Sequence, residues 1–119
     1  MRIIVSDSSC LIDLRKGKLL GPFLKLPYEL VIPDVLLENE LLSFTKREIA
    51  LMRREMSLRE KAEGARMECR GILWTVDEIG KARTATRARL LKALETWRDD
   101  PLVRLPHQEL GRMIVRYKT

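Results

Sequence analysis

Residues 1–14 of the chain, MRIIVSDSSCLIDL, contain the change of pattern that decides the fold. The β-branched run at residues 2–6 predicts a short buried strand. Ser8 and Ser9 are typical N-cap residues, so we expect a helix to begin there. Asp7 stands at the junction of the predicted strand and helix, and its carboxylate is the first candidate functional group in the chain.

A second strand is predicted at residues 28–33, YELVIP. Between the strands, residues 9–26 carry apolar side chains at roughly helical spacing, with breaks at Gly17 and at Gly21 and Pro22, which predicts two short helices. Pro33 fits the first turn of a further helix over residues 34–44. A strand, a helical connection and a second strand form a βαβ unit, which pairs its two strands in parallel through a right-handed crossover.

The rest of the chain is predicted to be mainly helical. Residues 45–66 are rich in charge and in strong helix formers, and MECRG at 67–71 fits a small edge strand. Further helices are expected over residues 72–82, from Thr84 or Thr86 to the residue before Pro101, and after Pro106. The expected fold class is therefore α/β, with a small parallel β-sheet of two to three strands covered by five to seven helices in one domain over residues 1–119. Because so small a sheet is marginal alone, we expect a homodimer.

The composition is typical of a soluble globular protein. Of the 119 residues, 45% are hydrophobic and 34% are charged. No apolar run reaches the roughly 18 residues that span a bilayer, and the first residues lack the pattern of a signal peptide, which predicts a cytoplasmic location. The two distant cysteines are expected to be reduced thiols, and the single histidine, His107, argues against a zinc site.

The net charge of +6 is concentrated in the C-terminal third, where residues 81–119 contain ten basic and four acidic side chains. This excess has two interpretations: a partner that carries phosphate groups, or a set of solvated helix faces. Trp74 and Trp97 lie in predicted helices, and we expect both to pack in the core rather than to stack on bases.

Acidic residues follow both predicted strands. Asp7 comes after the first strand, and Glu38 and Glu40 lie in the helix after the second. The carboxyl ends of parallel strands line the ligand crevice of an open sheet, so these side chains can converge. Converging carboxylates repel one another unless a cation neutralises them, and Mg²⁺ and Mn²⁺ prefer oxygen ligands. The pattern predicts a Mg²⁺ or Mn²⁺ site, with the alternative that Asp7 caps the following helix.

Two segments, IIVSDSSCLIDL at residues 3–14 and LPYELVIPDVLLENELL at 26–42, resemble the start of a PIN domain, the fold of VapC-type toxin ribonucleases. GILWTVDEIGKA at 71–82 and DDPLVRLPHQELGRMI at 99–114 are similar to the C-terminal helices of one bacterial PIN subgroup. The resemblance implies a Mg²⁺- or Mn²⁺-dependent endoribonuclease of a toxin–antitoxin pair, with RNA as substrate, an antitoxin protein as partner and a dimeric state.

The resemblance also assigns roles to individual residues. Asp7 matches the first metal-binding acid of the family, and Ser9 matches the small polar residue that supports it. The second acid falls on Glu40 or on Glu38, of which Glu40 is preferred. The arginines of the middle segment, Arg53, Arg54 and Arg59, would bind RNA phosphates.

The third and fourth acids of the family have no evident counterpart, which indicates that the PIN-like domain is internally shortened around residues 45–58. Acids elsewhere are the substitutes, although most such side chains are solvated helix charges: Glu48, Glu55, Glu60, Glu63 and Asp77. Two functions follow from this departure. The chain is expected to be a PIN-like ribonuclease or a catalytically inactive PIN-like module that binds nucleic acid or protein, and a third alternative is a shortened pseudogene product that folds poorly.

Overall fold

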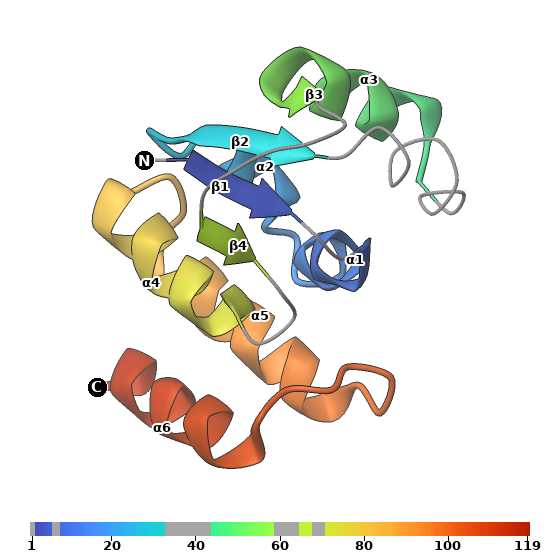
Figure 1. Cartoon of the computed structure of the whole chain (residues 1–119). Helices are drawn as coiled ribbons and strands as arrows, with labels where there is room; N and C mark the ends of the chain where they lie inside the picture. Colours follow the sequence, from blue (N-terminus) through green and yellow to red (C-terminus); the bar gives the residue numbers. More distant parts are fainter. Residues whose placement is uncertain (1, 6–7, 33–43, 59–64, 68–70) are drawn as a thin grey trace.

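The structure is a computed structural model that describes residues 2–5, 8–32, 44–58, 65–67 and 71–119 (Figure 1). Its elements follow the order β1 (Arg2–Val5), α1 (Ser8–Lys16), α2 (Leu20–Leu24), β2 (Glu29–Ile32), α3 (Lys46–Glu55), β3 (Ser57–Leu58), β4 (Ala65–Met67), α4 (Gly71–Ala82), α5 (Arg87–Asp99) and α6 (His107–Lys118). The α/β class is confirmed. No helix among the described residues is long and apolar enough to cross a membrane.

The sheet is parallel throughout and has the strand order β3-β2-β1-β4. The predicted parallel pairing of β1 with β2 is confirmed, with Ile3 opposite Leu30 and Ile4 opposite Val31. The predicted number of strands, two to three, is too low, because the described residues already contain four strands of this sheet. The strand expected at 67–71 lies earlier, at Ala65–Met67, and β3 lies within the segment that was predicted to be helical.

The helix predicted over residues 45–66 is shorter than expected. It begins after Thr45, whose hydroxyl accepts a hydrogen bond from the backbone N–H of Glu48, while the Glu48 carboxylate accepts one from the backbone N–H of Thr45. This capping box fixes the start of α3. The helix ends at Glu55, and Met56, in an extended conformation, leads directly into β3. Strong helix formers beyond Glu55 are therefore overridden by pairing with β2.

Helices α1 and α2 confirm the two predicted short pieces and the break at Gly17, whereas the break predicted at Gly21 and Pro22 is wrong, because both residues lie within the first turn of α2. The left-handed backbone at the break belongs to Lys18, with φ of 59°, rather than to Gly17. Gly17 is required for a different reason, since a Cβ at this position would lie 2.9 Å from Cζ2 of Trp97. The glycine therefore lets the end of α1 approach α5 closely.

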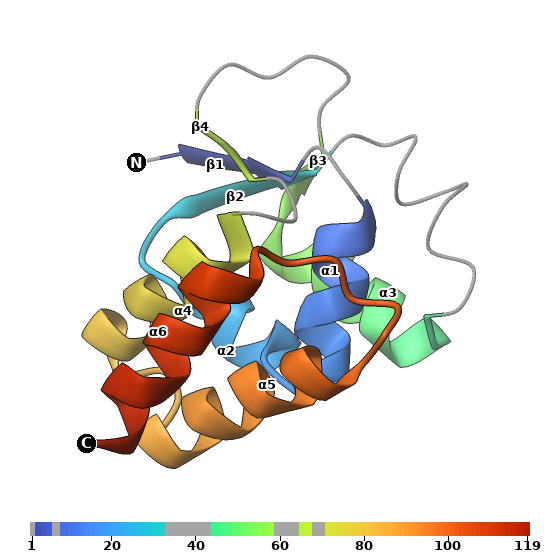
Figure 2. The same ribbon diagram turned by 90° about the horizontal axis from the view of Figure 1, so that it is seen from below.

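The described helices, α3 among them, lie on one side of the sheet (Figure 2). Their apolar faces form a single core with Ile3, Val5, Leu30 and Ile32 of the two inner strands. Trp97 lies in this core with 1% of its surface exposed, which confirms its predicted packing role. The same prediction is wrong for Trp74, whose side chain is 40% exposed on α4.

The last two helices begin and end where turn and cap residues predict. Thr86 caps α5 by accepting a hydrogen bond from the backbone N–H of Arg89 at 3.2 Å, which selects Thr86 over Thr84. Helix α5 ends at Asp99, before Pro101, and α6 begins directly after Pro106. Their packing against each other places the C-terminal end of α6 beside the start of α5 (Figure 1).

Candidate functional site

The carboxyl edge of the sheet is the natural place for a ligand in this topology. From β1 the chain moves outward to β2 and β3, and it returns to the opposite side of β1 as β4. This reversal places the topological switch point between β1 and β4, and open parallel sheets bind ligands outside the carboxyl ends of the strands at such a point. Val5 and Met67 are register partners at the ends of these two strands.

The predicted acids follow strands that end at this edge. Asp7 comes two residues after Val5 in the sequence, and Glu38 and Glu40 come after Ile32, the last residue of β2. All three acids lie outside the described residues. The structure therefore confirms the arrangement of the strands that precede them, and the convergence of the three carboxylates stays a prediction.

A further acid, Glu68, was missed by the sequence reasoning. It follows Met67, the last residue of β4, directly in the sequence, and it also lies outside the described residues. The strand was expected at 67–71, which placed Glu68 inside the strand rather than after it. Only pairing with β1 shows where β4 ends, because the sequence ARM carries no pattern typical of a buried strand.

Ser9 is in the first turn of α1, where its side chain is half-buried. Helix α1 begins three residues after β1 ends, so its N-terminus lies near the carboxyl edge of the sheet. The partial positive charge of a helix N-terminus stabilises a nearby carboxylate. This placement is compatible with both roles predicted for Asp7, as metal ligand and as helix cap.

Three of the five substitute acids have structural partners. Glu48 belongs to the capping box of α3 and pairs with Arg15 at 3.0 Å. Glu55 pairs with Arg54 at 3.4 Å. Glu60 and Glu63 lie outside the described residues. Within the described ranges, no three His, Cys, Asp or Glu side chains are grouped as metal ligands would be.

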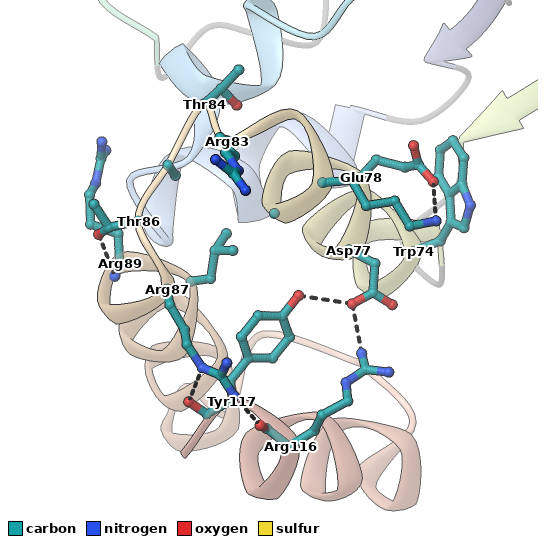
Figure 3. Close-up of a pocket in the computed structure, with 14 residues that line it drawn as sticks. Trp74, Asp77, Glu78, Arg83, Thr84, Thr86, Arg87, Arg89, Arg116 and Tyr117 are labelled. Atoms are coloured by element: carbon teal, nitrogen blue, oxygen red, sulfur yellow. Dashed lines mark hydrogen bonds and ion pairs between the residues drawn. The ribbon is translucent and has the colours of Figure 1, made fainter. Parts of the chain in front are cut away.

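Asp77 on α4 is the third substitute acid with a structural partner, and its partners lie on α6 (Figure 3). Its Oδ1 accepts hydrogen bonds from the Arg116 guanidinium at 2.6 Å and from the Tyr117 hydroxyl at 2.9 Å. Burial, together with the hydrogen bond to Asp77, raises the pKa of Tyr117 to about 12. The carboxylate of Asp77 therefore joins two helices rather than contributing to the sheet edge.

Replacing Tyr117 by phenylalanine is expected to change how stability depends on pH. The folded chain retains the Tyr117 proton up to about pH 12, whereas the unfolded chain loses it near the ordinary tyrosine pKa of 10.0. The stabilisation is fully present below pH 10 and is lost as the pH rises through the folded pKa. The melting temperature, measured from pH 9 to 11.5, should fall more steeply for the wild type than for Tyr117→Phe, and parallel curves would contradict the assignment.

The predicted RNA-binding arginines lie partly in the described chain. Arg53 and Arg54 are exposed near the end of α3, and Arg54 also pairs with Glu55. Arg59 lies outside the described residues. The exposure of Arg53 and Arg54 is compatible with phosphate binding and equally with solvation of the helix surface.

No protein-family model, no curated protein and no solved structure matches the chain. The order of the strands and the residues that follow them are thus the basis for assigning a function.

Proposed function

We propose that the chain is a PIN-like, metal-dependent ribonuclease of the toxin–antitoxin type, with Asp7 and Glu40, or else Glu38, as its metal ligands. The observation that carries the proposal is the pairing of β1, in parallel, with both β2 and β4. Each of these strands is followed in the sequence by an acid, and the switch point between β1 and β4 is where parallel sheets bind their ligands.

Glu68 supplies a third acid to this proposed site. A site with two carboxylates leaves Mg²⁺ mainly hydrated and weakly bound, so a third oxygen ligand after β4 strengthens the case. In the sequence, Asp7, Glu40 and Glu68 each follow one of three adjacent strands of one sheet. A divalent ion held there would neutralise the carboxylates and supply an activated water for hydrolysis of a phosphodiester bond.

The chain's own residues would also have to bind RNA. The exposed guanidinium groups of Arg53 and Arg54, together with Arg59 in the sequence, are proposed to hold RNA phosphates. Such contacts are independent of RNA sequence and weaken as salt is added. A homodimer and an antitoxin partner belong to the same proposal and derive from the resemblance alone.

A catalytically inactive PIN-like module that binds nucleic acid or protein is the second candidate function. The engagement of Glu48, Glu55 and Asp77 in capping and ion pairs favours it, because three of the substitute acids are committed to structural roles. This leaves the catalytic case dependent on acids that follow β1, β2 and β4.

Cleavage of a labelled single-stranded RNA by the purified chain tests the two functions. We expect cleavage in Mg²⁺ or Mn²⁺, loss of cleavage when EDTA chelates the ion, and recovery when Mn²⁺ is added in excess. RNA binding without cleavage in either ion would support the inactive module. Cleavage that is undiminished in EDTA would contradict a metal-dependent mechanism.

A further inference from the structure

A cavity of about 910 Å³ lies between α4, the start of α5 and the end of α6 (Figure 3). We name it the α4–α6 pocket, and the residues of its lining that matter for binding are Trp74, Lys81, Arg83, Arg87, Arg89 and Arg116. We propose that the α4–α6 pocket binds single-stranded RNA, with a base on Trp74 and phosphates on the arginines. The choice of RNA rests on the proposed function, whereas the binding itself requires no catalysis.

The first argument is the uncompensated positive charge of the pocket. Its lining contains five basic side chains and two acidic ones, Asp77 and Glu78. Both acids are already engaged: Asp77 pairs with Arg116 at 2.6 Å, and Glu78 pairs with Lys81 at 3.5 Å. Glu78 also accepts a hydrogen bond from the Tyr28 hydroxyl at 2.5 Å. Three arginines of the lining therefore have no Asp or Glu partner among the described residues.

These three arginines are Arg83, Arg87 and Arg89, and two of them are held by backbone oxygens. The Arg87 guanidinium donates to the backbone oxygens of Arg116 at 2.6 Å, of Tyr117 at 3.1 Å and of Thr119 at 2.5 Å, at the end of α6. Arg89 donates to the backbone carbonyl of Lys18 at 2.8 Å. Hydrogen bonds to carbonyls orient a guanidinium and leave its full charge in place, so the pocket has a fixed positive potential.

Arg83 is the cation with the greatest freedom to bind a ligand. It is exposed, it follows the last residue of α4, and its φ of 58° turns the chain toward α5. No hydrogen bond or ion pair engages its side chain within the described part of the chain. Figure 3 shows its guanidinium pointing into the space between the two helices. An unengaged arginine beside two fixed ones is suited to an anion with several oxygens.

Trp74 supplies an aromatic surface beside this charge. It is the one aromatic side chain in the described ranges that is large, apolar and exposed, at 40%. Trp74 and Lys81 are seven residues apart on α4 and so lie on the same face, roughly 10 Å apart along the helix axis. An isolated phosphate cannot span that distance. A strand that alternates flat bases and phosphates can, because bases stack on aromatic rings and phosphates bind cations.

RNA binding measured in EDTA tests the pocket without any cleavage. The probe is a 12-nucleotide labelled single-stranded RNA, followed by fluorescence anisotropy. We expect Trp74→Ala to weaken binding roughly tenfold, the usual effect of losing one stacked base, and Trp74→Phe to retain most of the affinity. Arg83→Gln should weaken binding and lower the salt slope by about 0.7, the value of one lost phosphate contact on a single strand.

Two matched controls separate the pocket from the general surface. Val115→Ala removes an exposed apolar side chain, 63% exposed, and Arg112→Gln removes an exposed arginine, both on α6 and outside the pocket. Both variants should bind as the wild type does. All four substituted side chains are exposed, and melting curves will verify that each variant folds.

Several outcomes would overturn the inference: no RNA binding by the wild type, wild-type binding by both Trp74→Ala and Arg83→Gln, or an acidic peptide that binds more tightly than the RNA. Failure of the proposed function looks different. In that case RNA is not cleaved in any divalent ion, while the losses in Trp74→Ala and Arg83→Gln are still observed in EDTA. Cleavage with no effect of the pocket variants would overturn the inference alone.

Discussion

Asp7→Asn is expected to lower the rate of metal-dependent RNA cleavage by at least about 100-fold. Asparagine keeps the size of the side chain and removes the negative charge that a divalent ion requires. Metal-ion catalysis contributes several kcal/mol of transition-state stabilisation, and about 1.4 kcal/mol corresponds to a factor of ten in rate. The measurement is single-turnover cleavage of labelled RNA at saturating Mn²⁺.

The matched control for this substitution is Asp99→Asn. Asp99 is an aspartate on α5 with a side chain 69% exposed, paired with Arg98 at 2.9 Å, and it lies in no proposed site. Its replacement should leave the cleavage rate unchanged. Equal cleavage rates for the wild type and Asp7→Asn would show that Asp7 has no part in the cleavage, and they would also indicate a contaminating nuclease.

The same assay identifies the remaining ligands. Glu40→Gln and Glu38→Gln are expected to differ, because the proposal assigns only one of the two, preferably Glu40, as a metal ligand. Glu68→Gln should reduce the rate if the acid after β4 joins the site, which the pairing of β4 with β1 predicts. A wild-type rate in Glu68→Gln would limit the site to the acids that follow β1 and β2.

Trp97→Ala is expected to lower the free energy of unfolding by about 3–5 kcal/mol, the usual cost of truncating a fully buried aromatic side chain. Trp97 is 1% exposed, its ring contacts the end of α1 at Gly17, and its Nε1 donates a hydrogen bond to the backbone carbonyl of Asp13 at 2.7 Å. The substitution therefore leaves a cavity between α1 and α5 and removes one of the two hydrogen bonds that the Asp13 carbonyl accepts, the other coming from the backbone N–H of Gly17 at 3.0 Å.

Trp97→Phe keeps one six-membered aromatic ring and removes the N–H group together with the rest of the indole, so it leaves a smaller cavity than Trp97→Ala. Its destabilisation should be clearly smaller than that of Trp97→Ala. Urea titrations followed by circular dichroism give both values. A loss below about 1 kcal/mol for Trp97→Ala would be typical of a surface residue and would contradict the packing of α5 against α1.

The inner half of the fold could be predicted from the sequence because its signals are local. The apolar runs of β1 and β2, the break after α1 and the threonine before α5 each depend on a few neighbouring residues. Strands β3 and β4 could not be located in this way. They contain two and three residues, and pairing with β2 and β1 determines their position more than any apolar pattern.

Tryptophan shows the same limit for single side chains. Trp74 and Trp97 both lie in amphipathic helices, yet one is 40% exposed and the other 1%. Helical spacing does not reveal which face meets the sheet when both faces carry apolar residues. The sequence did not predict the exposure of Trp74, and this exposure is what makes its ring available for stacking at the α4–α6 pocket.

The candidate site could be predicted in part for a related reason. Parallel pairing of β1 and β2 follows from the βαβ pattern, so the edge at which Asp7 and the later glutamates follow their strands was correctly predicted. Glu68 was missed because the end of β4 was misplaced. The partners of Asp77 could not be predicted, because Arg116 and Tyr117 lie 39 and 40 residues away in the sequence.

Calorimetric titration of the full chain with Mn²⁺ tests most directly whether the acids that follow β1, β2 and β4 act together. The proposed site predicts that the wild type binds Mn²⁺, that Asp7→Asn loses this binding and that Asp99→Asn retains it. Absence of Mn²⁺ binding by the wild type, or equal binding by Asp7→Asn, would contradict it.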